Sequence, residues 1–411
     1  MKKFNTIDLF TGCGGLLDGF LQSGHYTSIA SVEWEKAPVK TLRKRLADKW
    51  GCTDTEESVI HFDMQRFEEL CNGFENDPKY GSNKGLDALI GNQTIDVIVG
   101  GPPCQAYSVA GRVSDKDSMK NDYRNYLFEY YLKIVSRYKP KVFVFENVPG
   151  MLSAMPDGTP IVNLIKRDMN NNGYEVLEDL SKAVLDTSDF GVPQQRKRVI
   201  IIGVNKEYFK NYDIQEIISD FYFEILEAYK VLTKKTVYDA IGDMPGCYPM
   251  KNITVVDRRK VSHSIPECTY SWHVARFQND RDIKIFNLLA RDIETGANLY
   301  QDSNKLNELY NEATGANSKV HKYHVLRKDK PSTTILAHLY KDGLRFIHYD
   351  SEQARTITVR EAARLQTFDD DFEFVGTMAD AYKMIGNAVP PKFAKALANG
   401  VNDFLKKYSE V

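Results

Sequence analysis

Short apolar runs alternate with helical segments through the first half of this 411-residue chain. The runs are rich in β-branched residues, a composition that favours buried strands. They occupy residues 4–10, 26–34, 59–62, 95–99, 141–145, 174–185 and 198–204. Strands that alternate with helices predict an α/β fold built on a doubly wound, mostly parallel sheet.

One of these runs, Ile95–Val99, leads directly into the loop Gly100-Gly101-Pro102-Pro103-Cys104. The two prolines restrict the backbone of the loop and of the residues that precede them. The cysteine is therefore held beyond the carboxyl end of a strand, where open α/β sheets bind their ligands. A lone cysteine is usually a small buried hydrophobe, but this rigid frame favours a nucleophile.

A glycine-rich turn, Thr11–Gly15, follows the first expected strand. Its glycines would let the backbone approach a nucleotide-like ligand. Glu33 ends the second strand, where such folds place an acid on ribose hydroxyls, and the Gly-x-Gly-Gly spacing argues against a nicotinamide dehydrogenase. Asp63, after the third strand, would either accept a hydrogen bond from a base amino group or cap a helix.

Charged side chains also occur at later strand ends. Glu146 follows the apolar run Val142–Phe145, where poor solvation would let a carboxyl group serve as an acid near neutral pH. The alternative is a carboxylate satisfied by backbone N–H groups. The segment Gln194–Arg198 carries three basic residues into the last strand. Such a run is usually a solvated face, but an arginine turned inward would support an anionic intermediate.

The αβ alternation stops near residue 205, and a helical pattern returns at Thr358. Residues 206–330 are polar and irregular, so we expect a second, smaller domain there, with residues 1–205 plus 331–411 forming the catalytic and cofactor-binding domain. Between residues 251 and 345 the chain has 16 Lys and Arg against 11 Asp and Glu, whereas the net charge of the whole chain is −2. A basic segment on a mildly acidic protein fits a nucleic-acid footprint, and also a solvated surface.

Composition narrows the cellular context. No apolar run reaches the ~18–20 residues that span a membrane, and Asp8 interrupts any signal-like apolar core after the basic N-terminus. We therefore expect a cytoplasmic protein without a membrane partner. The six cysteines form no CxxC pair, so we expect neither a metal site nor a disulfide framework, and Cys104 as a free thiol.

Together these motifs resemble those of the cytosine-C5 DNA methyltransferase family. They occur in the family's order: Asp8–Gly15, Gly100–Ser108, Glu146-Asn147-Val148, Gln194-x-Arg196-x-Arg198, Thr358–Gln366 and Gly386–Pro390. The resemblance covers about residues 4–205 and 330–405, and the Pro-Cys loop combined with Glu-Asn-Val and Gln-x-Arg-x-Arg is highly specific. One departure is Cys13, at a variable position of the first turn where the backbone should suffice.

The resemblance implies a Rossmann-like DNA (cytosine-5-)-methyltransferase. It would transfer the methyl group of S-adenosyl-L-methionine to C5 of a flipped-out cytosine in a specific duplex sequence, leaving S-adenosyl-L-homocysteine. Cys104 would add to C6, Glu146 would donate to N3, Arg198 would brace the ring, and Arg196 would help to hold the site. The residues expected around the cofactor are Phe10, Gly12, Cys13, Gly15, Glu33, Trp34, Asp63, Met64, Pro102, Leu127, Asn387 and Val389.

By the same resemblance, residues 206–330 would read double-stranded DNA. The protein would be a bacterial monomer, associated with the nucleoid, that protects DNA from a restriction endonuclease without binding that nuclease. One alternative is the tRNA branch of the family, but its Cys-Phe-Thr signature is replaced here by Cys268-Thr269-Tyr270. Another is a catalytically silent DNA-binding regulator, which the intact Cys104, Glu146 and Arg198 disfavour. No rule converts residues 206–330 into a recognition sequence.

Overall fold

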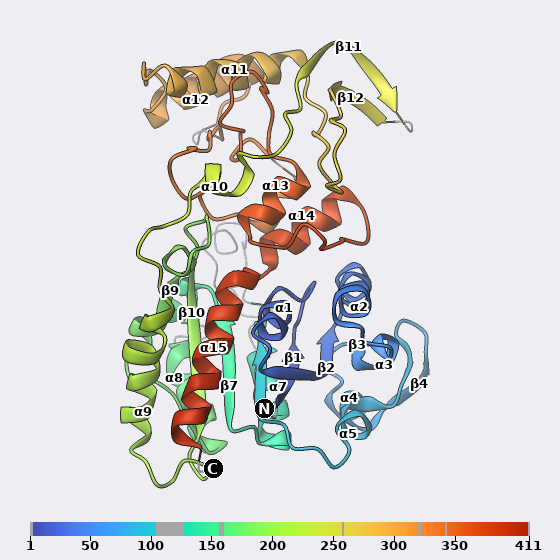
Figure 1. The fold of residues 1–411 in the computed structure, drawn as a ribbon, viewed down its shortest axis with the longest axis vertical. Helices are drawn as coiled ribbons and strands as arrows, with labels where there is room; N and C mark the ends of the chain where they lie inside the picture. The colour runs from blue at the N-terminus through green and yellow to red at the C-terminus, as the bar shows by residue number, and fades with distance from the viewer. Residues whose placement is uncertain are drawn as a thin grey trace. The chain divides into compact units, whose positions relative to one another are not determined.

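The computed structural model describes residues 3–103, 127–155, 160–256, 259–318, 322–341 and 343–409. The chain forms two compact units (Figure 1). The first unit contains Met1–Gly191, Arg196–Thr233 and Ala388–Val411, and the second contains Val192–Gln195 and Lys234–Asn387. Each unit has its own buried core.

An eight-stranded sheet forms the centre of the first unit, with the strand order β3-β2-β1-β6-β7-β10-β8 and β9 paired beside β10. Strands β3, β2, β1, β6 and β7 are parallel, whereas β10 runs antiparallel to β7, β8 and β9. The bounds are β1 Phe4–Leu9, β2 Tyr26–Glu33, β3 Val59–His61, β6 Val97–Gly100, β7 Val142–Asn147, β8 Tyr174–Glu175, β9 Val184–Asp186 and β10 Lys197–Asn205. The predicted mostly parallel α/β sheet is confirmed.

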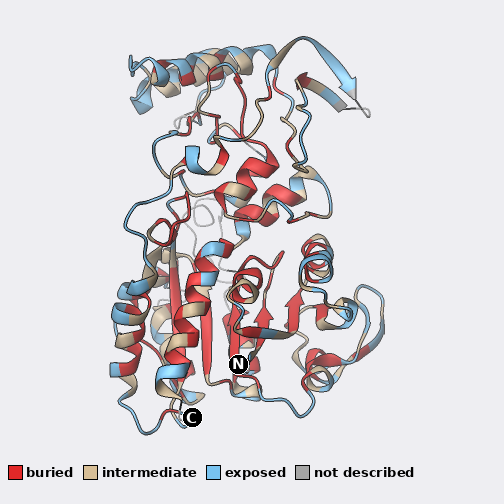
Figure 2. Cartoon of the chain, viewed as in Figure 1, coloured by how far each residue is buried: buried red, intermediate tan, exposed pale blue. Residues whose placement is uncertain are grey.

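Helices cover both faces of this sheet (Figure 1). Helices α1 (Gly15–Gln22) and α15 (Pro391–Tyr408) lie in front of it, and α7 (Leu127–Tyr138) and α8 (Ile161–Asn171) lie behind it. Helices α1 and α15 pack closely because Gly19 has no side chain: a Cβ there would lie 2.4 Å from the Cβ of Ala394. The strands between the helix layers are almost entirely buried (Figure 2), as their near-continuous apolar runs require.

Two predicted elements of the first unit are wrong in detail. Residues 174–185, expected as one strand, form β8 and β9, which are separated by a 3-10 turn at Leu180–Ala183. The side chain of Asp179 accepts a hydrogen bond from Ser181 N at 3.0 Å and so starts that turn. Residues 67–92, expected as a helix and a loop, contain helices α4 (Phe67–Asn72) and α5 (Gly85–Ile90) around a hairpin of β4 (Phe74–Asp77) and β5 (Gly81–Asn83).

The boundaries of the compact units differ from those expected at residues 206 and 330. Helix α9 (Ile214–Asp220) and the π-helical turn Phe221–Ile225 belong to the first unit. There, the hydroxyl of Tyr222 donates to Ile200 O at 2.7 Å and accepts from Ile202 N at 3.0 Å. Residues 331–387 belong to the second unit. The assignment of DNA reading to residues 206–330 stays a prediction.

The second unit is built from one hairpin and several helices. Its elements are α10 Val237–Ile241, β11 Pro249–Val256, β12 Arg259–His263, α11 Asp280–Glu294, α12 Ser303–Thr314, α13 Val359–Leu365 and α14 Met378–Asn387. An apolar core includes Phe286, Leu289, Tyr323 and Ile347. Helix α13 begins with a capping box, in which Thr358 and Glu361 satisfy each other's backbone N–H groups.

Candidate active site

A pocket lies at the carboxyl ends of the parallel strands of the first unit. The strand order places β1 between β2 and β6, so the sheet has its topological switch point between β1 and β6. Open α/β sheets bind ligands in the crevice at this point. The pocket is lined by Phe10, Val32, Glu33, Trp34, Phe62, Asp63, Met64, Gln65, Pro103 and Leu127.

Six of these lining residues belong to the predicted cofactor set: Phe10, Glu33, Trp34, Asp63, Met64 and Leu127. They come from the ends of β1, β2 and β3 and from the start of α7, segments that are distant in sequence. The other four, Val32, Phe62, Gln65 and Pro103, were not predicted to contact the cofactor. Each of those four is adjacent in sequence to a predicted residue or to the predicted nucleophile. This adjacency could have been used to predict them.

The carboxylate of Glu33 is held by backbone N–H groups at the edge of this pocket. Gly12 N donates to Oε2 at 2.8 Å, and Trp34 N and Glu35 N donate to Oε1 at 2.9 and 2.8 Å. Burial raises the pKa of Glu33 to about 7, although these hydrogen bonds act in the opposite direction. Gly12 therefore positions Glu33 and does not itself line the pocket.

Asp63 also lines the pocket, and its Oδ1 accepts a hydrogen bond from Gln65 N at 3.0 Å. Helix α4 begins at Phe67 with Arg66 as its N-cap, so Asp63 does not cap that helix. Instead, Asp63 stabilises the turn after β3, which leaves a carboxylate at the pocket edge. Phe10 directly follows β1 and has a φ of 56°, a left-handed conformation that residues other than glycine rarely adopt.

Four further residues of the predicted cofactor set belong to the first unit but do not line the pocket. Cys13 is buried, and burial raises the pKa of its thiol to about 12, so the thiol stays neutral. Gly15 begins α1. Pro102 is buried, and its carbonyl accepts a hydrogen bond from Asn147 Nδ2 at 3.3 Å. Val389 is buried in the first unit.

The last predicted cofactor residue, Asn387, is assigned to the other unit. It is exposed and ends α14, as the final residue of the second unit. The pocket in the first unit therefore gathers strand-end residues from β1, β2 and β3, while Asn387 and Val389 lie on opposite sides of a unit boundary.

Glu146 and Arg198 form an ion pair in the first unit, with Arg198 Nε 2.8 Å from Glu146 Oε1. Strands β7 and β10 are antiparallel, and Glu146 pairs with Ile200. Arg198 is two residues from Ile200, so its side chain lies on the same face of the sheet as the carboxylate. Both side chains are only 12–13% exposed. This geometry places a carboxylate and a guanidinium together at the end of β7.

Arg196 lies two residues before Arg198, directly ahead of β10, and is almost completely buried. Its backbone N donates to Asp186 Oδ1 at 3.3 Å, and its carbonyl accepts from Thr187 N at 3.0 Å. Burial lowers the pKa of Arg196, and the nearby positive charge of Arg198 lowers it further. Burial also lowers the pKa of Arg198, whereas the negative charge of the Glu146 carboxylate acts to raise it. The segment expected either as a solvated face or with one arginine turned inward thus has two largely buried arginines, and their role in catalysis stays a prediction.

Gly101, which follows β6, passes directly beside Glu146. A Cβ added at Gly101 would lie 2.6 Å from Glu146 Oε2, closer than such contacts occur in proteins. Only a residue without a side chain lets the loop approach the carboxylate in this way. Cys104 lies outside the described residues, whereas Pro103, which precedes it, lines the pocket.

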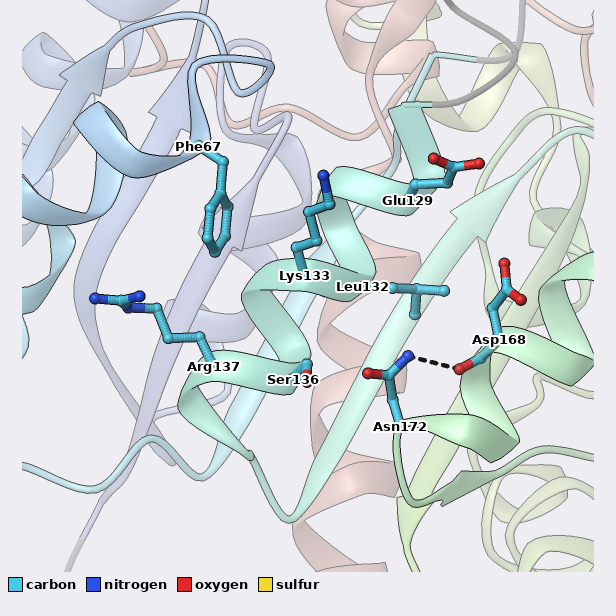
Figure 3. A pocket seen from close by; sticks show the side chains of 8 residues that line it. All are labelled: Phe67, Glu129, Leu132, Lys133, Ser136, Arg137, Asp168 and Asn172. Atoms are coloured by element: carbon cyan, nitrogen blue, oxygen red, sulfur yellow. Dashed lines mark hydrogen bonds between the residues drawn. The ribbon is translucent and has the colours of Figure 1, made fainter.

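A second pocket lies on the helices of the first unit (Figure 3). It is lined by Phe67, Glu129, Leu132, Lys133, Ser136, Arg137, Asp168 and Asn172. Burial raises the pKa of Glu129, and the negative charge of Asp168 raises it further. Among the residues that the structure describes, none of the predicted site residues lines this pocket. Its lining comes from α4, α7 and the end of α8 and not from the strand ends.

Two other observations bear on the predicted partners. Among the described residues, no group of three or more His, Cys, Asp or Glu side chains is arranged to hold a metal ion. Within the same parts of the chain, no helix combines the length and the apolar character needed to cross a membrane.

The fold and the pocket define a class of protein. The sheet is open and mostly parallel, and acidic residues at the ends of two adjacent strands line a pocket at the switch point. This arrangement is typical of α/β enzymes that bind a nucleoside-type cofactor. The solved structure of an E. coli prophage-encoded protein, described as a DNA modification methyltransferase, has the same fold, with a TM-score of 0.61 and 24% identity. That match covers 98% of this chain and 100% of the other.

The sequence comparisons are more specific. The model of the C-5 cytosine-specific DNA methylase family matches residues 4–402. The chain is 33% identical to the type II methyltransferase M.Bpa9945I of Bacillus paralicheniformis, across 97% of this chain and 98% of the relative. It is 31% identical to the type II methyltransferase M1.HphI of Haemophilus parahaemolyticus, across 96% of this chain and 86% of the relative.

The chain therefore belongs to the C-5 cytosine-specific DNA methylase family. This confirms the resemblance drawn from the motifs and the predicted DNA (cytosine-5-)-methyltransferase activity. Membership of the family implies S-adenosyl-L-methionine as the methyl donor and DNA as the substrate.

Proposed function

We propose that the pocket at the ends of β1, β2 and β3 binds S-adenosyl-L-methionine. The bound cofactor supplies the methyl group of the reaction. Its nucleoside has hydroxyl and amino donors, which suit the carboxylates of Glu33 and Asp63 at the pocket edge. The aromatic and apolar side chains of Phe10, Trp34 and Met64 would enclose the base. These residues therefore fit the cofactor that the family implies.

The remainder of the predicted cofactor set would act less directly. Gly12 would hold Glu33 in place through its N–H group. Cys13, Gly15 and Pro102 would shape the backbone of the two loops, since none of them lines the pocket. Val389 would support the site from the segment that enters α15, and the role of Asn387 rests on the family resemblance alone.

We further propose that Glu146, Arg196 and Arg198 activate the target cytosine. Glu146 would bond to N3 and the amino group of the base, while Arg198 holds the carboxylate through the 2.8 Å ion pair. Two arginines against one carboxylate give this end of β7 and β10 a positive balance. A positive site stabilises the negative charge that develops on the ring when a nucleophile adds to it.

Cys104 would be that nucleophile. A bond forms between its sulfur and C6, C5 gains electron density and takes up the methyl group, and the C5 proton is then lost while the S–C6 bond breaks. The target base must leave the duplex for C6 to be reached. The observation that carries this assignment is the Glu146–Arg198 pair, lying against Gly101 on the loop that leads to Cys104.

A trapping experiment tests this mechanism. Fluorine at C5 cannot leave as a cation, so duplex DNA containing 5-fluorocytosine at the target position should hold the enzyme after methyl transfer. We expect a complex that survives denaturing electrophoresis, requires S-adenosyl-L-methionine, and maps to Cys104 by peptide mass. Cys104→Ser should abolish it, because a serine hydroxyl is far less nucleophilic than a thiolate. Trapping at another cysteine would overturn the assignment of the nucleophile.

For the biological role, we propose that this enzyme is the modification half of a restriction–modification system. Its relatives M.Bpa9945I and M1.HphI are named type II methyltransferases. Bisulfite sequencing of DNA from cells that express the protein should reveal one methylated sequence context. Resistance of that DNA to a nuclease of the same specificity, compared with DNA from cells expressing Cys104→Ser, would support protection. Methylation of total tRNA in place of duplex DNA would refute the proposal.

A further inference from the structure

We propose that Tyr80 is a positioning residue for the cofactor pocket, because its ring supports two walls of that pocket. This inference rests on the proposed function, in which the pocket binds S-adenosyl-L-methionine. Tyr80 does not line the pocket itself. It belongs to the turn between β4 and β5, two short strands that form a hairpin of their own outside the eight-stranded sheet (Figure 1).

The first supported wall is Phe62, which directly follows β3 and lines the pocket. The centroid of the Tyr80 ring lies 5.0 Å from that of the Phe62 ring, and the two planes are tilted by 60°. Phe74, the first residue of β4, stacks on Phe62 with a centroid distance of 4.0 Å. The hairpin therefore contributes two rings that fix the Phe62 ring, and such ring pairs attract each other beyond the area that they bury.

The second supported wall is Trp34, which Tyr80 reaches through His61. His61 Nε2 lies 3.1 Å from the carbonyl oxygen of Trp34. Because a carbonyl only accepts, Nε2 carries the proton of this hydrogen bond. The Tyr80 and His61 rings meet edge to face, with centroids 5.0 Å apart and planes at 79°. Tyr80 thus supports the imidazole that fixes the backbone of Trp34, a residue that lines the pocket.

The position of Tyr80 is fixed in turn by Asp77, the last residue of β4. Asp77 Oδ1 accepts hydrogen bonds from Lys79 N and Tyr80 N, both at 2.8 Å. Asp77 Oδ2 forms an ion pair with Arg66 at 2.5 Å. The Arg66 guanidinium also lies 4.6 Å from the centroid of the Phe62 ring. The carboxylate therefore ties the hairpin turn to the segment that follows β3.

These contacts imply that the hairpin and the bound cofactor stabilise each other. An isolated two-stranded hairpin is only marginally stable in water, so β4 and β5 depend on the packing of their rings against Phe62 and His61. A cofactor that orders Phe62 should also order the hairpin. By linkage, an ordered hairpin should raise the affinity for the cofactor by the same factor. The effect requires no contact between Tyr80 and the cofactor.

Three variants of the full-length enzyme test this role. Tyr80→Ala removes both ring contacts, whereas Tyr80→Phe keeps the ring. Tyr212→Ala is the matched control, because it removes a tyrosine ring that lies 5.2 Å from Tyr408 elsewhere in the first unit and does not line the pocket. Calorimetry measures the affinity of each variant for S-adenosyl-L-homocysteine, and circular dichroism checks that each variant is folded.

We expect Tyr80→Ala to raise the Kd for S-adenosyl-L-homocysteine about tenfold, since coupling between two sites usually changes affinity by about 5–150-fold. Tyr80→Phe and Tyr212→Ala should keep the wild-type affinity. At saturating S-adenosyl-L-methionine, Tyr80→Ala should methylate DNA at close to the wild-type single-turnover rate, because the variant leaves the Glu146–Arg198 pair intact. Unchanged affinity in folded Tyr80→Ala, or an equal loss in Tyr212→Ala, would overturn the inference.

Hydrogen exchange of the wild type supplies a second test that needs no variant. Saturating S-adenosyl-L-homocysteine should slow exchange of the Lys79 and Tyr80 amides, which bond to Asp77. The slowing should be about tenfold, because the coupling is reciprocal. Exchange of the amides around Tyr212 should not change. Equal exchange of the hairpin with and without the ligand would overturn the inference, even if Tyr80→Ala failed to fold.

The failure of this inference can be distinguished from the failure of the proposed function. If the wild type binds neither S-adenosyl-L-methionine nor S-adenosyl-L-homocysteine, the proposed function of the pocket fails. If the wild type binds the cofactor and Glu33→Ala weakens that binding while Tyr80→Ala does not, only the inference about Tyr80 fails.

Discussion

Arg198 Nε lies 2.8 Å from Glu146 Oε1, and the carboxylate it holds lies against Gly101, the residue that follows β6. One side chain thus faces both an arginine from the neighbouring antiparallel strand and the loop that leads to the predicted nucleophile. The position of Glu146 is fixed from two directions, so changes on either side should alter catalysis without altering the cofactor pocket.

Replacing Glu146 by Gln tests its proposed role as an acid. The amide keeps the shape of the side chain but cannot supply a proton to N3, and it loses the charge that pairs with Arg198. We expect single-turnover methyl transfer to fall by roughly 10²–10⁴-fold, the usual effect of losing a general acid. Calorimetry should show unchanged binding of S-adenosyl-L-methionine. A near-normal single-turnover rate would exclude an essential proton donor at this position.

Adding one methyl group at Gly101 should disturb the same carboxylate from the other side. In Gly101→Ala the new Cβ would lie 2.6 Å from Glu146 Oε2, so the carboxylate or the loop must move. We expect methyl transfer to fall by at least about tenfold, since displacements of about 1 Å in an active site cost as much as 10²-fold. The double variant Gly101→Ala/Glu146→Asp shortens the acid. The shorter side chain in the double variant should restore the contact with Arg198 only in part. Full activity of Gly101→Ala would contradict the prediction.

Glu33 should govern cofactor affinity. Its carboxylate lines the pocket while accepting three backbone hydrogen bonds. Glu33→Ala removes a charge-assisted hydrogen bond to the ribose worth about 1.5–3 kcal/mol, which corresponds to roughly 10–150-fold in Kd. Isothermal calorimetry with S-adenosyl-L-methionine measures this loss, and circular dichroism checks that the variant is folded. Unchanged affinity in a folded variant would remove Glu33 from the site.

Asp8 should make stability depend on pH in a defined direction. It is buried in β1, accepts a hydrogen bond from the Thr11 hydroxyl, and has a pKa raised by burial from 3.8 to about 7. The folded state therefore binds a proton that the unfolded state releases between about pH 4 and pH 7, so ionisation of Asp8 lowers the free energy of unfolding as pH rises through this window. Above about pH 7 that contribution is lost.

Asp8→Asn removes this titration but keeps an acceptor for Thr11. Compared with wild type, the melting temperature of the variant should rise progressively between pH 4 and pH 7 and differ by a constant amount above about pH 7. Differential scanning calorimetry across this range measures the difference, in which the titration of groups that do not interact with Asp8 cancels. A difference between the two proteins that does not vary with pH would show that Asp8 ionises alike in the folded and unfolded states.

Chimeras should depend on where the second unit is cut. Residues 206–233 belong to the first unit, where Tyr222 bonds to the backbone of β10 at Ile200 and Ile202. A chimera that exchanges residues 234–387 with a relative of different specificity should fold and methylate the relative's sequence. An exchange of 206–387 should melt at a lower temperature, because it also replaces the covering of β10. If the methylated sequence followed the first unit instead, the recognition role would be misassigned.

Sequence patterns predicted which residues lie at the strand ends of this protein, but not which residues are brought together by the pairing of its strands. Glu33 and Asp63 follow consecutive parallel strands, so their convergence on one pocket follows from the αβ alternation alone. The contact between Glu146 and Arg198 depends on the register of β10 against β7, which no local pattern encodes. Similarly, the cap at Asp179 divided a predicted strand, because a side-chain hydrogen bond outweighed the β propensity around it.

The limits of the second unit were also beyond local reasoning. Helix α9 lies outside the regular alternation of strands and helices, so the sequence pattern does not assign it to the first unit. It packs in that unit through buried apolar side chains such as Ile217 and Ile218. Helices α13 and α14 carry motifs of the family, yet they pack with the second unit. Unit boundaries depend on which faces bury one another, and that information is spread along the whole chain.

The chain passes between its two units four times, and one of these excursions is only the segment Val192–Gln195. There, Gln194 accepts from Ile335 N at 2.8 Å and donates to Gln366 Oε1 at 2.9 Å, two residues before Arg196 returns to the first unit. A genetic exchange of residues 234–387 between two such genes would leave this segment behind. The exchanged residues would fold correctly only if they offered Gln194 a matching donor and acceptor. The four residues that are not exchanged therefore limit which second units can be combined with this first unit, and so which new specificities can evolve.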